Sequence, residues 1–137
     1  YIDEADGWRT NIYNLPIVGA SDGGAYTTVA DLTTLWKAFW GNEIVPLDLV
    51  KIFATPYVKV ETEGGRLSYG HGLWIKMGPD GQAEVYMTGG DAGVSFRSSV
   101  KHASHLQVTV LSNTTNGAWP LLRDIEIALS ALTLPAA

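Results

Sequence analysis

A cluster of glycines between two alternating segments constrains the fold of this chain more than any other feature. Three glycines lie within residues 86–93, namely Gly89, Gly90 and Gly93. Apolar and polar residues alternate before them over 83–88 and after them over 94–101. Alternation with a period of two is typical of β-strands. Because glycine has no Cβ, the connection is either a tight hairpin or backbone that a ligand can approach closely.

The composition indicates a folded domain and excludes several classes of function. The 137 residues are 46% hydrophobic and include five Trp and six Tyr, as expected for one globular domain. A net charge of −5 and scattered basic residues argue against binding to nucleic acid or anionic lipid. No apolar run approaches the roughly 20 residues of a membrane span. The absence of cysteine excludes disulfides and thiolate catalysis.

Two helices are predicted before the strands and one after them. Thr28 and Asp31 have the spacing of a capping box, and an apolar stripe of helical period follows, with Gly41 placed as the left-handed residue that ends the helix. A shorter helix has Pro46 in its first turn. Pro120 lies near the start of the last helix. Its apolar face is expected to comprise Leu121, Leu122, Ile125, Ala128, Leu129 and Leu132.

The remaining segments predict strands and their connections. Residues 1–20 are interpreted as an extended or irregular arm and 57–68 as a polar connection. Strands are expected at 69–76, 83–87, 94–101 and 106–110, joined by short turns. This order predicts an α+β fold, with an antiparallel β-sheet of about four strands, two preceding helices and a C-terminal helix packed on the sheet.

Four motifs follow one another along the chain. They are GGAYTTVADL at 23–32, YGHGLW at 69–74, TGGDAG at 88–93 and VLSN at 110–113. In this order they resemble the C-terminal half of serine β-lactamase-like proteins, which include class C β-lactamases, penicillin-binding-protein-like DD-peptidases and related esterases. The resemblance implies that 1–137 is a single domain or fragment, the C-terminal part of that fold. Residues 1–56 would belong to its helical region, and 57–137 would form the sheet with the C-terminal helix.

The resemblance also implies one wall of a serine acyl-transfer site. A K-[ST]-G or H-[ST]-G motif of the family aligns with Met87-Thr88-Gly89. By this resemblance Thr88 would contact the substrate carboxylate, and the backbone N–H of Gly90 would form half of the oxyanion hole. Such a donor contributes about 2.7–4 kcal/mol to catalysis. Met87, Thr88, Gly89 and Asp91 are therefore the expected substrate-binding residues. Met87 departs from the motif, because a thioether neither donates a proton nor carries charge.

The nucleophile motif of the family, S-x-x-K, has no credible match here. Residues 98–101 fit formally, but in a strand residues three apart point to opposite faces. No Tyr-x-Asn occurs, and Ser21-Asp22-Gly23 has Gly where the family's S-D-N motif has an amide. His102 and His105 lack a third ligand at suitable spacing, so we expect no metal and no cofactor.

The sequence therefore predicts the C-terminal portion of a serine β-lactamase-like hydrolase, which is inactive alone because it lacks the nucleophile. The substrate is left open among β-lactams, peptides and esters. The expected partner is the N-terminal half of the same enzyme, and an uncovered sheet edge or helix face would otherwise favour self-association. The alternative is a standalone, non-catalytic binding module. The family resemblance favours a location outside the cytoplasm.

Overall fold

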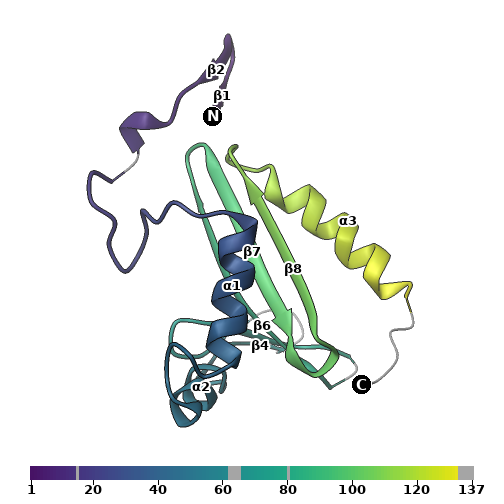
Figure 1. Cartoon of the computed structure of the whole chain (residues 1–137). Helices are drawn as coiled ribbons and strands as arrows, with labels where there is room; N and C mark the ends of the chain where they lie inside the picture. Colours follow the sequence, from purple (N-terminus) through teal and green to yellow (C-terminus); the bar gives the residue numbers. More distant parts are fainter. Residues whose placement is uncertain (15, 62–65, 80, 133–137) are drawn as a thin grey trace. The chain divides into compact units, whose positions relative to one another are not determined.

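The computed structural model describes residues 1–14, 16–61, 66–79 and 81–132 of the chain (Figure 1). These residues form three α-helices, a two-stranded sheet and a six-stranded sheet. The large sheet has the order β3-β4-β5-β6-β7-β8, and the pairings from β3 to β6 are antiparallel. The predicted α+β class with an antiparallel sheet is confirmed.

The large sheet has more strands than the approximately four expected. Its members are β3 (Val58–Lys59), β4 (Leu67–Tyr69), β5 (Trp74–Met77), β6 (Ala83–Asp91), β7 (Val94–Lys101) and β8 (Leu106–Ser112). Strands β3 and β4 fall mainly in the segment predicted to be a polar connection, of which 62–65 lie outside the described residues. The backbone N–H of Val60 donates to the Leu67 carbonyl at 3.0 Å. Strand β3 lies at the sheet edge and is exposed along its length, so it needs no apolar alternation to form.

The N-terminal arm contains more regular structure than its sequence predicts. Strands β1 (Ile2–Glu4) and β2 (Gly7–Arg9) form an antiparallel hairpin, and a 3₁₀ turn follows at Ile12–Asn14. Gly7 has a φ of 131°, a conformation that other residues rarely adopt. With three residues per strand, the hairpin is too short to show a period in the sequence.

Helix α1 (Val29–Trp40) begins as predicted and ends one residue later than predicted. The Asp31 carboxylate accepts from the Thr28 N–H at 3.1 Å, and the Asp31 N–H donates to Thr28 Oγ1 at 3.1 Å, which completes the capping box. The left-handed residue after the helix is Asn42, with a φ of 62°, and not Gly41. Asn42 N–H donates to the Phe39 carbonyl and Glu43 N–H to that of Ala38, the pattern of a Schellman motif.

Helices α2 (Leu47–Phe53) and α3 (Ala118–Ser130) lie where they were expected. Pro46 is the N-cap of α2 rather than a first-turn residue. On α3, Ala118 and Leu122 are buried, whereas Leu121 is 51% exposed. The buried stripe thus starts one turn earlier than predicted, and Leu121 lies beside it. Leu132 is exposed because the helix ends before it.

The described residues divide into two compact units. The first unit contains Tyr1–Asp31, Thr88–Arg97 and the described part of Thr109–Thr133. The second unit contains Leu32–Met87 and Ser98–Val108. Its core consists of Trp36, Leu73, Ile75, Val85 and Val100. Half-buried aromatic rings of α1 and α2 pack against that core, among them Phe39, Trp40 and Phe53.

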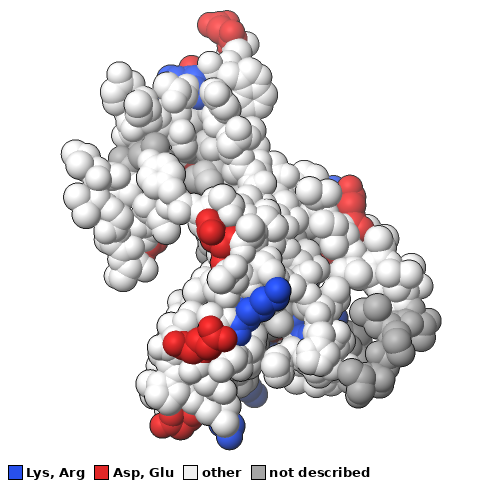
Figure 2. Space-filling model, in the orientation of Figure 1, with Lys and Arg blue, Asp and Glu red and all other residues white. Residues whose placement is uncertain are grey.

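On the face shown in Figure 2, acidic and basic side chains lie in small groups among larger uncharged areas. Within the described residues, no helix combines the length and apolar character needed to cross a membrane.

Candidate functional site

The glycine-rich stretch lies at the end of strand β6 and not in a loop. Gly89 and Gly90 lie inside β6, and the turn at Ala92 and Gly93 joins it to β7. Of these glycines only Gly93 has a positive φ, of 82°. The hairpin interpretation is therefore correct, and the turn needs glycine at position 93 alone.

Neighbouring side chains distinguish the two glycines within the strand. A Cβ on Gly89 would come within 2.6 Å of Phe96 Cε1, so the Phe96 ring lies where a side chain at residue 89 would be. A Cβ on Gly90 would lie 3.5 Å from Trp119 Cζ2, an ordinary contact. Glycine is thus required sterically at 89, whereas at 90 the fold leaves room for at least a methyl group.

Contacts within the first unit hold the hairpin tip. The Gly93 N–H donates to Thr115 Oγ1 at 2.9 Å, and Asn11 Nδ2 donates to the Ala92 carbonyl at 3.3 Å. Asn11 packs so closely that a Cβ on Gly93 would lie 2.7 Å from Asn11 Cβ. The turn is therefore fixed from two directions, by the N-terminal segment and by the loop before α3.

Ser95 connects strand β7 to helix α3 of the same unit. Its side chain is completely buried. Its Oγ donates to the Thr114 carbonyl at 2.9 Å and accepts from the Ala118 N–H at 3.1 Å. It thus satisfies one of the free N–H groups at the helix start, as a capping side chain does. In the sequence Ser95 is only the polar member of an alternating strand, so this role gave no signal there.

Thr88 and Asp91 present exposed polar groups near the same strand end. The Thr88 hydroxyl donates to the Phe96 carbonyl at 2.8 Å. The Asp91 carboxylate accepts from the Ala92 N–H at 2.7 Å. Four of the five residues expected at the site, Thr88, Gly89, Gly90 and Asp91, thus lie together on one hairpin arm of the first unit.

Met87 belongs to the second unit. Its half-buried side chain lines an apolar pocket together with Trp36 and Leu73, among others. The residue that precedes Thr88 in β6 therefore contributes a thioether to an apolar surface and no charge.

The other candidates from the sequence have structural roles. Ser98 is buried in β7, and its Oγ accepts from Trp36 Nε1 at 2.8 Å, which is incompatible with an exposed nucleophile. The His102 ring stacks on Trp40 with centroids 4.4 Å apart, and the His105 ring lies 6.1 Å from that of His102. Across the described part of the chain, no group of three or more His, Cys, Asp and Glu residues is arranged to hold a metal ion.

Comparison with solved structures identifies the fold. A penicillin binding protein from Bacillus halodurans is similar to this chain with a TM-score of 0.84 and 37% identity. The match covers 93% of this chain and 39% of that chain. A D-stereospecific amidohydrolase from Streptomyces sp. matches with a TM-score of 0.56 and 21% identity, over 65% of this chain and 26% of that chain. At this lower identity the similarity concerns the fold alone.

No protein-family model matches the sequence, and a search of curated proteins finds no match. The chain spans about 39% of the length of the penicillin binding protein, so it corresponds to part of a larger enzyme fold. Both structural neighbours have the serine β-lactamase-like fold. The chain therefore belongs to the serine β-lactamase-like family and represents a part of that fold.

Proposed function

We propose that the chain is the C-terminal portion of a serine β-lactamase-like hydrolase that transfers acyl groups from β-lactam, peptide or ester substrates. The observation that carries the proposal is the match to a penicillin binding protein over 93% of this chain but 39% of that one. The nucleophile, in an S-x-x-K motif, and Tyr-x-Asn would then be supplied by an N-terminal half of the same enzyme. The chain alone has no covalent route to products.

The backbone N–H of Gly90 is our candidate for one donor of the oxyanion hole. The pairing of β5 with β6 ends at Trp74↔Tyr86, and β6 continues for five more residues, Met87 to Asp91. The turn that follows is held by Asn11 and Thr115. A donor on rigid backbone is already oriented before the reaction, and this pre-organisation is what makes oxyanion holes effective.

Thr88 is the candidate contact for a polar substrate group. Because its hydroxyl proton is donated to the Phe96 carbonyl, Thr88 can accept a hydrogen bond directly. To donate to a substrate carboxylate, it has to release that carbonyl. Gly89 and Asp91 complete the wall. Gly89 contributes backbone alone, because the Phe96 ring fills the place of a side chain there, and Asp91 places a carboxylate at the strand end.

Met87 is the observation that favours the alternative function. Since a thioether can neither carry charge nor donate a proton, it cannot attract an anionic substrate group or take part in a proton relay. A standalone module that binds a ligand without catalysis would need neither property. This alternative predicts that no upstream S-x-x-K segment restores activity.

The test is reconstitution with an upstream segment that carries S-x-x-K and Tyr-x-Asn. The 137-residue chain alone should not hydrolyse a chromogenic cephalosporin or a short-chain ester above buffer. Joined to the upstream segment it should hydrolyse one of them, and Ser→Ala in S-x-x-K should abolish turnover. Suppose instead that the chain alone turns over substrate and that changing one of its own serines abolishes this turnover. This result would refute the proposal that the nucleophile lies in the upstream segment. An inactive but folded full-length protein would support the binding module.

A further inference from the structure

The second unit contains an apolar pocket of about 190 Å³. Helix α1 contributes Leu35, Trp36 and Phe39 to its lining, and Phe53 comes from the end of α2. The sulfur-bearing side chain of Met87 lines it from β6. These elements come from distant parts of the sequence, so no short sequence motif predicts the pocket.

The connection between β4 and β5 forms the rim. Gly70 N–H donates to the Leu73 carbonyl at 2.8 Å, and Gly72 adopts a φ of 87°, which closes a tight turn. This turn places His71, Gly72 and Leu73 in the pocket lining. His71 is exposed, and its ring contacts Tyr57 with centroids 5.0 Å apart.

The pocket offers almost no polar atoms to a ligand. Among the described residues that line it there is no Lys, Arg, Asp or Glu. The indole N–H of Trp36 is already donated to Ser98 Oγ, which leaves the His71 imidazole at the rim as the polar side chain of this described lining. A charged group placed inside would lose its hydration without gaining a partner, and this costs several kcal/mol. The lining therefore selects for neutral groups.

The size of the pocket defines the ligand more closely. An engineered cavity of about 150 Å³ lined by Leu, Ile and Phe binds benzene. At about 190 Å³ this pocket has room for one six-membered ring or a branched aliphatic group. The flexible thioether of Met87 adapts to irregular apolar shapes and makes favourable contacts with aromatic rings.

We propose that this pocket is a binding site for a neutral aromatic or branched aliphatic group, with the Met87 thioether as its contact from β6.

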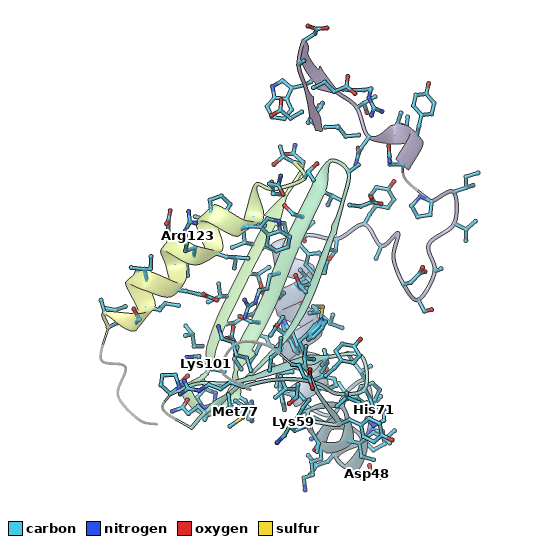
Figure 3. The ribbon with its side chains drawn as sticks, turned by 180° about the vertical axis from the view of Figure 1, so that it is seen from behind. Asp48, Lys59, His71, Met77, Lys101 and Arg123 are labelled. Carbon is cyan, nitrogen blue, oxygen red and sulfur yellow. The ribbon has the colours of Figure 1, made fainter. Side chains whose placement is uncertain are left out.

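The two methionines of the chain provide a direct test. With ¹³C-methyl methionine, the NMR spectrum contains one methyl resonance from Met87 and one from Met77, which lies on β5 and does not line the pocket. Figure 3 shows Met77 well away from His71 at the rim. Titration with benzene should shift the Met87 methyl with saturation and leave Met77 in place. Benzoate, the same ring with a charge, should bind at least about tenfold more weakly.

A pair of matched variants controls for changes elsewhere. Leu35 lines the pocket and Leu49 does not, and both are 39% exposed on short helices. Leu35→Phe should reduce benzene affinity about tenfold by filling the space, while Leu49→Phe should leave it within about twofold. Equal shifts of both methyls, equal affinity for benzene and benzoate, or equal effects of the two variants would overturn the pocket proposal.

Discussion

The aromatic ring of Phe96 lies directly over Gly89, where a Cβ would come within 2.6 Å of Phe96 Cε1. An aromatic residue beside a strand glycine covers backbone that would otherwise be exposed, and it excludes any side chain at that glycine. The two residues therefore form one packing unit at the candidate site, since the Phe96 carbonyl also accepts the Thr88 hydroxyl proton.

The first prediction separates the two glycines of β6. Gly89→Ala should lower the free energy of unfolding by about 1–3 kcal/mol, because the methyl group displaces the Phe96 ring. Gly90→Ala should change it by less than about 0.5 kcal/mol, since its methyl group makes an ordinary contact with Trp119. Urea denaturation measures both. In the Gly89→Ala background, Phe96→Ala should cost less than it does alone, and strict additivity of the two changes would contradict the packing unit.

The second prediction concerns the buried hydroxyl of Ser95. Ser95→Ala should lower the free energy of unfolding by about 1–3 kcal/mol, because the Ala118 N–H at the start of α3 loses its acceptor inside the protein. Ser130→Ala is the matched control. Its hydroxyl donates to the Ile127 carbonyl at the exposed end of the same helix, so its loss should cost less than about 0.5 kcal/mol. Thermal or urea unfolding that ranks the two variants equally would show that Ser95 does not cap the helix.

The third prediction concerns the bond from Trp36 to Ser98 in the core of the second unit. Ser98→Ala removes the acceptor of a buried indole N–H and should cost about 1–3 kcal/mol of stability. Ser104→Ala, whose hydroxyl makes a long bond of 3.5 Å, should cost less than about 0.5 kcal/mol. In the reconstituted enzyme, Ser98→Ala should still form the acyl-enzyme at temperatures where it is folded. A folded variant that cannot be acylated would instead make Ser98 the nucleophile.

The fourth prediction is self-association of the isolated chain. The first unit exposes large apolar side chains between residues 12 and 26, and the most exposed are Tyr13 at 90%, Ile17 at 102% and Tyr26 at 81%. Apolar surface of this kind favours association. Light scattering over a dilution series should show an apparent mass that rises with concentration, and Tyr13→Ser with Ile17→Ser should reduce it.

The sequence also indicated the apolar face of the last helix, α3, as a surface for self-association. This face is not exposed as a whole, since Leu122 is only 6% exposed. Leu121→Ser on α3 is the control, because it removes one exposed apolar side chain outside residues 12–26, and it should leave association unchanged. A compact monomer at every concentration would instead favour the standalone binding module.

Local chemistry explains which features the sequence predicted correctly. The capping box of Thr28 and Asp31 depends on residues three positions apart, so its three hydrogen bonds follow from the sequence whatever surrounds them. The alternation around residues 86–93 likewise depends on the strand period alone. The order of four short motifs was sufficient to indicate the serine β-lactamase-like family, which the match to a penicillin binding protein then supported.

By itself, then, the sequence determined the α+β class, the main helices and strands, and the family. Only the tertiary structure decided which glycine needs to be glycine, because that depends on Phe96 and Trp119 from outside strand β6. It also decided that Ser95 caps a helix more than twenty residues away and that Met87 lines a pocket built from four elements. The physical reason is the separation along the sequence over which each effect acts. Secondary-structure propensity, helix capping and hydrophobic periodicity act over a few residues. Steric exclusion, buried hydrogen bonds and cavities depend on side chains that only the folded chain brings together.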